Sequence, residues 1–218
     1  WRAPLLGDDR IFLRSDPEPQ PGFSVDLLLD GSASRLHCQE IIAAQGFLLA
    51  KSLAACGIPV RVSSFCSLRG YTVLRILKDF PDRNAERKIF DYFAAGWNRD
   101  GLALRGMAPL LRDAPAEKRL LLLLTDASPN DSHKIPPSDR VPLSRDYDGP
   151  AAVQDTAAQV RTLRQRGVRV AAIFMGESAS FPDARTIYGR DLVRIRRMDE
   201  LAGAAGKLIQ QEIAELSD

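Results

Sequence analysis

The segment Val25-Asp26-Leu27-Leu28-Leu29-Asp30-Gly31-Ser32-Ala33-Ser34 places one carboxylate and two hydroxyls directly behind an apolar run. The segment from Phe23 to Leu29 is apolar on consecutive positions, which predicts a strand covered on both faces. Such strands belong to mostly parallel sheets that carry helices on both faces. In these sheets, ligands bind beyond the carboxyl ends of the strands. The segment therefore predicts an α/β fold with a candidate ligand site that begins at Asp30.

The rest of the chain alternates predicted strands and helices. Further strands are expected at Val60–Ser67, Tyr71–Leu77, Arg119–Thr125, Val168–Met175 and Leu192–Ile195. Helices are expected at Cys38–Ala55, Ala85–Ala94, Leu102–Leu111, Ala152–Arg166, Phe181–Tyr188 and Glu200–Leu216. This order predicts a doubly wound, Rossmann-like, mostly parallel sheet with helices on both faces. A hairpin turn at Arg69-Gly70 predicts one antiparallel strand at the edge of that sheet.

Two segments fall outside the alternation. Residues 1–22 are rich in proline, and we interpret them as a leader or linker, or as the tail of an upstream region, with one short strand at Ile11–Leu13. Residues 23–218 then form a single domain, and the start at Trp1 suggests a piece of a longer protein. The polar loop from Ala127 to Pro150 is long enough to be either functional or disordered.

Composition narrows the class of protein. The net charge is +2 and no basic cluster is interleaved with aromatic residues, so nucleic-acid binding is unsupported. The longest apolar run, Leu120–Leu124, is too short to cross a membrane. Cys38, Cys56 and Cys66 are too few for a disulfide framework and are expected to be buried and reduced, which fits a cytoplasmic protein.

The carboxylates at two strand ends favour a metal site. Asp30, Ser32 and Ser34 offer a carboxylate and two hydroxyls from one turn, and Asp126 adds a carboxylate after the leucine-rich strand. Mg²⁺ prefers such oxygen ligands. The same residue types also cap helices, and for the segment after Asp30 alone the two interpretations are equally good. The second strand end favours the metal.

These motifs resemble the metal-ion-dependent adhesion site (MIDAS) of the von Willebrand factor A (vWA) domain. The resemblance extends from Phe23 to the end of the chain and rests on DxSxS at Asp30, on Thr125-Asp126, and on Asn98-Arg99-Asp100-Gly101 between them. The family usually has a threonine where this chain has Asp100. The aspartate variant is similar to the A domains of nitric-oxide reductase activation proteins and large cobaltochelatase subunits.

The resemblance implies a protein-binding module and not an enzyme. It implies Mg²⁺, with Mn²⁺ or Ca²⁺ as possible substitutes, and a protein partner whose acidic residue completes the coordination. The implied metal ligands are Asp30, Ser32, Ser34, Asp100 and Asp126. The implied partner is a MoxR-type AAA+ ATPase or a metalloenzyme client, with no nucleic acid or membrane involved. Predicted partner contacts are Trp97 and Arg99 beside one motif, and Asp131 and His133 in the long loop.

Two departures from the family pattern affect these expectations. Asp100 adds a third carboxylate, so the site is negative unless Asp100 lies outside the ligand shell or Arg99 compensates its charge. Asp100 could also be a simple cap for the helix that follows. Ala127 stands where the family most often has glycine.

Two other classes of function remain open. A phosphotransferase with an aspartyl nucleophile would need a second aspartate at Ser32, and Gly31–Ser34 lacks the pattern of a hydrolase elbow. No phosphate-binding glycine motif is found in the sequence, and His37 and His133 have no zinc-ligand spacing and are weak candidates for general bases. A metal-independent scaffold with a degenerate site is the third possibility.

Overall fold

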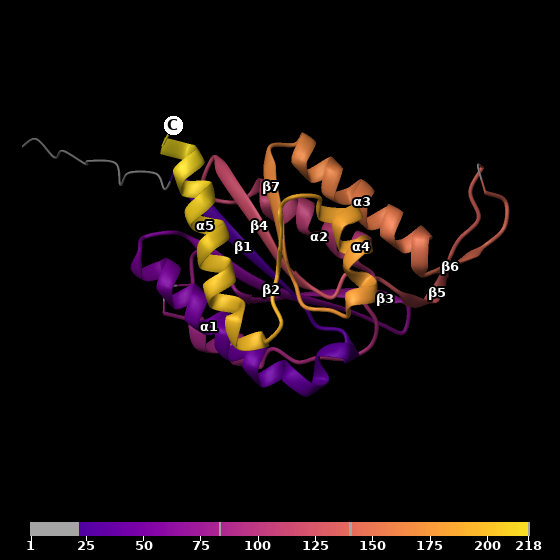
Figure 1. The fold of residues 1–218 in the computed structure, drawn as a ribbon, viewed down its shortest axis with the longest axis horizontal. Helices are drawn as coiled ribbons and strands as arrows, with labels where there is room; N and C mark the ends of the chain where they lie inside the picture. Colours follow the sequence, from indigo (N-terminus) through magenta and orange to yellow (C-terminus); the bar gives the residue numbers. More distant parts are fainter. Residues whose placement is uncertain (1–21, 83, 140, 218) are drawn as a thin grey trace, which may run out of the picture.

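The computed structural model describes residues 22–82, 84–139 and 141–217. Its centre is a six-stranded sheet in the order β3-β2-β1-β4-β7-β8 (Figure 1). The strands are β1 (Phe23–Asp30), β2 (Val60–Leu68), β3 (Tyr71–Lys78), β4 (Lys118–Thr125), β7 (Val168–Phe174) and β8 (Leu192–Arg194). Neighbouring strands are parallel except for β2 and β3. The predicted sheet with one antiparallel edge strand is therefore confirmed. The predicted segment 1–22, with its strand at Ile11–Leu13, lies outside the described residues except for Gly22.

Helices cover both faces of the sheet (Figure 1). On one face lie α1 (Gln39–Ala55) and α5 (Leu201–Ser217). On the other lie α2 (Asp100–Arg112), α3 (Gly149–Gln165) and α4 (Phe181–Tyr188). Short 3₁₀ helices join these elements: η2 (Ala33–Cys38), η3 (Glu86–Asp91), η4 (Ser178–Ser180) and η5 (Met198–Glu200). The doubly wound architecture is confirmed.

The central strands explain why two cores form. Successive side chains of a strand point to opposite faces. In β1, Leu27 and Leu29 enter the core under α1 and α5, whereas Leu28 enters the core under α2 and α3. The five leucines of β4 divide in the same way. A strand that serves two cores must be apolar on both faces, as the sequence of β1 and β4 predicted.

The helix predicted at Ala85–Ala94 is wrong. Only the 3₁₀ helix η3 forms there, and Tyr92 after it has the extended backbone angles φ −59° and ψ 133°. Ile89 and Tyr92 are both buried, and a 3₁₀ helix places residues three apart on one face. The Tyr92 hydroxyl donates to the Asp30 backbone carbonyl at 2.6 Å, which holds this segment against the end of β1.

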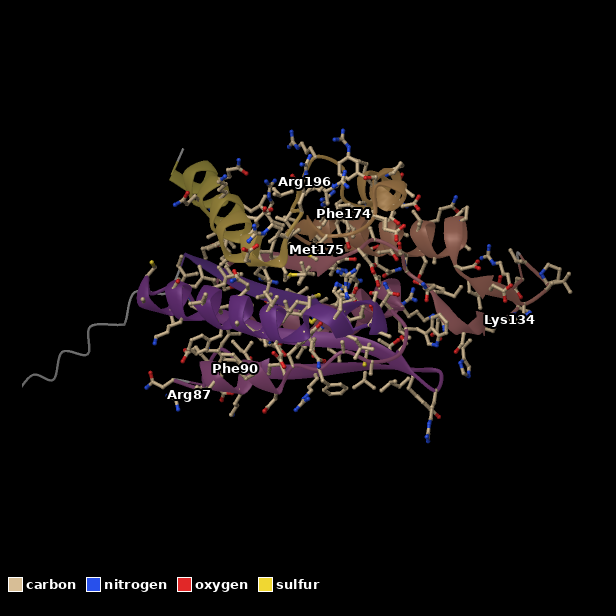
Figure 2. The ribbon with its side chains drawn as sticks, turned by 60° about the horizontal axis from the view of Figure 1, so that its bottom comes forward. Arg87, Phe90, Lys134, Phe174, Met175 and Arg196 are labelled. Atoms are coloured by element: carbon tan, nitrogen blue, oxygen red, sulfur yellow. The ribbon has the colours of Figure 1, made fainter. Side chains whose placement is uncertain are left out.

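The long loop is not structureless. It contains a two-stranded antiparallel ribbon of β5 (Asp131–Ile135) and β6 (Arg145–Tyr147), in which Asp131 pairs with Tyr147. The ribbon extends from one end of the molecule, as the position of Lys134 shows, while Phe90 lies on the side of α1 (Figure 2). The sequence did not predict this strand, because most side chains of β5 are polar and face solvent.

Two of the three cysteines are buried, as the sequence predicted. Cys38 and Cys66 are buried, but Cys56 is exposed because it caps the C-terminus of α1. Across the described part of the chain, no helix combines the length and apolar character that crossing a bilayer requires.

Candidate metal centre

The predicted motifs meet at the point where the strand order reverses. β1 continues through α1 to β2 on one side, whereas β4 leads through α3 to β7 on the other. Because β1 and β4 are parallel neighbours, their carboxyl ends lie together. Such a switch point is the usual ligand site of an open α/β sheet. Asp30 ends β1, and Asp126 directly follows β4.

The hydroxyls that follow β1 do not cap a helix. The backbone N–H of Ser32 donates to Asp30 Oδ1 at 2.8 Å. The Ser32 and Ser34 hydroxyl oxygens are 2.9 Å apart, and Ser34 donates onward to Asp126 Oδ2 at 2.9 Å. Neither η2 nor α1 has a side-chain capping hydrogen bond. The two serines and Asp126 therefore form a polar chain between the strand ends, and the capping interpretation does not account for it.

The turn after β4 aims Asp126 at this chain. Ala127 has φ +53°, in the left-handed region that glycine occupies most readily, and its N–H donates to Thr125 Oγ1 at 2.9 Å. The backbone N–H of Ser128 donates to Asp126 Oδ1 at 3.1 Å, and Asn98 Nδ2 lies 3.5 Å from the same oxygen. The family's usual glycine at position 127 is thus explained by the backbone, and alanine adopts the same conformation at some cost.

Asp100 lies in the first turn of α2 and is fully buried. Its Oδ2 accepts a long hydrogen bond of 3.4 Å from the Thr125 hydroxyl. α2 has no side-chain capping hydrogen bond, so Asp100 does not act as the cap. Its Oδ1 has no hydrogen-bond partner among the described residues.

The NRDG turn around Asp100 is held tightly. The N–H of Gly101 donates to the Tyr147 hydroxyl at 3.2 Å, and that hydroxyl donates to Asp155 Oδ2 at 2.9 Å. A Cβ atom on Gly101 would lie only 2.1 Å from Asp155 Oδ2, so a larger residue there would displace the Asp155 carboxylate. The beginning of α2 is therefore fastened to β6 and α3.

Arg35 is the residue of the candidate centre that the sequence did not reveal. Its guanidinium lies 2.5 Å from Asp126 Oδ2 and donates to the Met175 carbonyl at 3.0 Å. Its Nε is 3.7 Å from Asp30 Oδ2, an ion-pair distance too long for a hydrogen bond. Arg35 is only 4% exposed, although an arginine on a short helix is usually at the surface. The only hint in the sequence was the unmet need for a cation beside three acids.

Arg99, one of the two alternatives for offsetting the charge of Asp100, pairs with a different acid. It lies 3.5 Å from Asp131 Oδ2 and packs over the Tyr147 ring at 4.4 Å. Asp131 also accepts the His133 backbone N–H at 3.1 Å. Arg99 and Asp131 therefore join the NRDG turn to the β5–β6 ribbon.

The other predicted partner contacts are more accessible. Trp97 is 47% exposed, while its backbone pairs with Ser67 of β2. His133 is exposed, and its ring lies over the hairpin turn at Gly70, where a Cβ would approach His133 Nε2 to 2.6 Å. Both flank the same edge of the sheet as Asp30. Their role in partner binding stays a prediction.

Burial and mutual repulsion make the acidic groups hard to ionise together. Burial, followed by the nearby charge of Asp126, raises the pKa of Asp30 to about 7, although Arg35 opposes the shift. Burial, followed by the charges of Asp30 and Asp126, holds the pKa of Asp100 well above its usual range. One arginine does not neutralise three carboxylates. The cluster therefore favours a further positive charge.

The residues present fit a hard dication. Asp30 Oδ2 and Asp100 Oδ1 are buried oxygens without a hydrogen-bond partner in the described ranges, and two serine hydroxyls lie beside them. These are the ligand types that Mg²⁺ takes. Within residues 22–82, 84–139 and 141–217, no three His, Cys, Asp or Glu side chains are grouped closely enough to hold an ion by themselves. An ion here would therefore depend on the serine hydroxyls.

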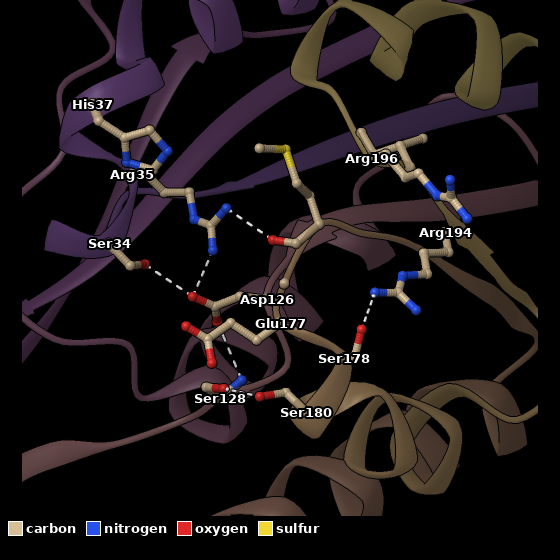
Figure 3. A pocket seen from close by; sticks show the side chains of 13 residues that line it. Ser34, Arg35, His37, Asp126, Ser128, Glu177, Ser178, Ser180, Arg194 and Arg196 are labelled. Carbon is tan, nitrogen blue, oxygen red and sulfur yellow. Dashed lines mark hydrogen bonds and ion pairs between the residues drawn. The ribbon is translucent and has the colours of Figure 1, made fainter.

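A pocket of about 670 Å³ opens beside these groups (Figure 3). Ser34, Arg35 and Asp126 line one side of it, and residues that follow β7 and β8 line the other. The candidate centre is thus reachable from solvent through Asp126 and Ser34, while Asp30 and Asp100 lie fully buried behind them.

Comparisons with known proteins agree with the fold. No model of a known protein family matches the chain. The chain is 29% identical over 184 residues, 80% of its length, to Protein NorD of Brucella abortus, and it spans only 27% of that relative. The vWF domain of the type V pili tip protein Mfa5 from Porphyromonas gingivalis superposes with a TM-score of 0.64 at 12% identity, over 90% of this chain and 97% of that one. The manganese-loaded TRAP protein of Plasmodium vivax gives a TM-score of 0.60 at 21% identity, over 87% and 74%. The chain has a vWA-like fold and is similar in sequence to a segment of NorD.

Proposed function

We propose that this domain is a metal-dependent protein-binding module. One observation carries the proposal: the Ser32 hydroxyl contacts the Ser34 hydroxyl, and Ser34 donates to Asp126 across the strand ends, instead of either serine capping a helix. Two orphan carboxylate oxygens, on Asp30 and Asp100, lie in the same buried cluster. These groups would hold Mg²⁺, with Mn²⁺ or Ca²⁺ as substitutes.

Each residue has a distinct part in this proposal. Asp30, Ser32 and Ser34 would supply oxygen ligands from one turn, and Asp126 and Asp100 would add charge from the neighbouring strand and from α2. A bound dication would supply the positive charge that the buried carboxylates lack and would lower their pKa values. The TRAP structure with a comparable fold contains manganese, which supports testing that ion as well.

The proposed partner is a protein with an exposed acidic residue. Ser34 and Asp126 are the candidate ligands that reach the pocket, so an incoming carboxylate would meet the ion there. From the similarity to NorD, we propose a MoxR-type AAA+ ATPase or a metalloenzyme client, and a role in metal insertion or metalloenzyme maturation in the cytoplasm. Trp97, Arg99, Asp131 and His133 would border the contact. The chemistry is coordination and not turnover.

Calorimetric titration of Mg²⁺ into metal-free protein tests the site. We expect binding in the wild type, no binding in Asp30→Ala, and binding weakened about tenfold in Ser34→Ala, because one neutral ligand is lost. Ser52→Ala is the matched control, because Ser52 is an exposed serine on α1. Asp100→Ala shows whether the third carboxylate is a ligand. Absence of binding in the wild type, with Mn²⁺ as well, would leave a metal-independent scaffold.

Size-exclusion chromatography tests the partner. The domain and a MoxR-type ATPase should migrate together in Mg²⁺ and separately after chelation. Co-migration that persists in chelator and in Asp30→Ala would contradict a metal-dependent contact.

A further inference from the structure

The pocket beside the candidate metal centre has a basic wall that the metal site does not use. Arg194 and Arg196 line it opposite Ser34 and Asp126 (Figure 3). Arg194 ends β8 and Arg196 follows it, and β8 lies two strands away from β4, which leads to Asp126. In Figure 2, Arg196 lies on the same side of the molecule as Met175 and Phe174. The pocket thus borders the candidate metal centre on one side and two arginines on the other.

The Arg194 side chain is restricted by contacts with a hydroxyl and two aromatic rings. Its guanidinium donates to the Ser178 hydroxyl at 2.9 Å and lies over the rings of Phe181 and Phe174, at 5.3 and 5.7 Å from their centroids. These contacts restrict the side chain, yet it stays exposed. A restricted arginine loses less conformational entropy when it binds a carboxylate.

Neither arginine is neutralised. Throughout the described residues, no carboxylate lies within ion-pair distance of the Arg194 or Arg196 guanidinium, whereas the adjacent Arg197 is paired with Asp199. Only the backbone N–H of Arg196 is engaged, by Glu200 at 3.1 Å. Two unpaired cations in a concave polar pocket form a complementary surface for acidic groups.

We infer that this pocket binds an acidic peptide segment that carries two separated carboxylates. One carboxylate meets the metal side at Ser34 and Asp126, and the second pairs with Arg194 and Arg196. The inference rests on the proposed function, and it adds the chemical character of the partner segment. A volume of about 670 Å³ lies within the range of ligand pockets and admits a few residues of peptide.

A phosphate group suits the pocket less well than two carboxylates. Glu177 and Asp126 also line the pocket, so a compact ligand of high negative charge would be repelled by both. Two single charges held apart can instead avoid these acids, with one at the ion and one at the arginines. The spacing between the two carboxylates then determines which segments bind.

Fluorescence anisotropy with labelled peptides tests the inference. Each peptide carries two glutamates separated by a different number of alanines, and a matched peptide has one glutamate replaced by glutamine. In saturating Mg²⁺, Arg196→Gln should bind the best two-glutamate peptide about fivefold more weakly, because a partly exposed ion pair is lost. It should bind the one-glutamate peptide unchanged. Arg194→Gln should behave alike, although it also loses the ring contacts.

Arg197→Gln is the control, because it removes the same charge from the same loop but outside the pocket lining. It should leave the affinity for every peptide unchanged. Mg²⁺ titration of Arg196→Gln should match the wild type, which separates this inference from the proposed function. If Mg²⁺ binds but Arg196→Gln weakens both peptides equally, or no more than Arg197→Gln does, the second-carboxylate subsite is wrong.

Two other results are equally decisive. If the wild type binds no metal, the proposed function fails, and the two-carboxylate arrangement fails with it. If inorganic phosphate binds the metal-free protein and displaces the peptide through Arg194 and Arg196, the basic wall is an anion site of another class. Either result would overturn the assignment of an acidic peptide.

Discussion

Strand β1 carries two buried aspartates, Asp26 and Asp30, and each lies close to a buried arginine. Asp26 lies opposite Arg61 of β2 in the parallel register, and Asp26 Oδ1 is 2.6 Å from Arg61 Nε. Arg61 also packs over the Phe80 ring at 4.6 Å. Here one buried acid meets one buried base inside the sheet, and Arg61 Nη1 also lies 3.6 Å from Oδ1 of the partly exposed Asp79.

At Asp30 the balance is different. Arg35 is shared between Asp30 and Asp126, Asp100 adds a third acid, and two serine hydroxyls complete the cluster. An orphan carboxylate oxygen is found at both places, on Asp26 as well as on Asp30, so such an atom alone does not mark a metal site. Excess acid, hydroxyl ligands and a position at the carboxyl end of the strand together distinguish the candidate centre from a structural ion pair.

The largest expected effect is at the balanced pair. Arg61→Ala should lower the free energy of unfolding by about 3–5 kcal/mol, because it leaves Asp26 buried without its partner. Replacing both residues, as Asp26→Leu with Arg61→Met, should recover most of this loss, since no uncompensated charge remains. Urea unfolding monitored by circular dichroism measures both. If the double variant is as unstable as Arg61→Ala, an uncompensated charge on Asp26 does not explain the loss of stability.

The same pair should make stability depend on pH. Burial outweighs the attraction of Arg61 and raises the pKa of Asp26 to about 6, from 3.8 for the free group. The folded protein therefore holds this proton to higher pH than the unfolded chain does. Stability from this group is greatest below pH 3.8 and falls as pH rises to about 6, by about 3 kcal/mol in total.

Urea unfolding across this pH range, in the wild type and in the Asp26→Leu/Arg61→Met variant, isolates the effect. Asp30 titrates in both proteins, so its contribution cancels in the difference. The two pKa values of Asp26, 3.8 in the free group and about 6 in the folded protein, bound the pH range that matters. If the two proteins differ in unfolding free energy by the same amount across that range, Asp26 is ionised in the folded state.

The smallest expected effect is at Arg35. Arg35→Met keeps the apolar part of the side chain and removes its charge, so Mg²⁺ should bind about tenfold more tightly because no cation competes for the carboxylates. The metal-free variant should be less stable than the wild type, and Mg²⁺ should raise its melting temperature by a larger amount. Calorimetry and thermal unfolding with and without Mg²⁺ measure both. Weaker Mg²⁺ binding in this variant would show that Arg35 supports the site instead of competing with it.

Much of the fold follows from local sequence. β1 and β4 each contain a run of consecutive leucines, and a strand between two helical layers needs apolar residues on both of its faces. The hairpin turn at Arg69-Gly70 was also predicted, and both residues adopt positive φ there. η3 was predicted as a full helix, because apolar spacing does not distinguish an α-helix from a 3₁₀ segment held by one tyrosine. The β5–β6 ribbon was missed, because its strands face solvent on both sides.

The candidate site was predictable only in part. The carboxylates and serines were identified because they follow two strands that a parallel sheet must bring together. Arg35 was not, because its partner Asp126 is 91 residues away in sequence and its burial depends on the packed fold. The contact of Arg99 with Asp131 was not predicted either, since Asp131 lies in a ribbon that the sequence did not reveal. Ion pairs between residues far apart in sequence can be identified only from the folded structure.

The contact of Gly101 with Tyr147 and Asp155 has a consequence for how this domain can vary. Tyr147 ends β6, so the ribbon is anchored at its base, next to Asp100, while its tip extends into solvent. Lengthening a surface loop beyond an anchored base costs little free energy, because the closure entropy grows only with the logarithm of its length. Insertions and deletions at the tip can therefore remodel a recognition surface over evolution without displacing Asp100.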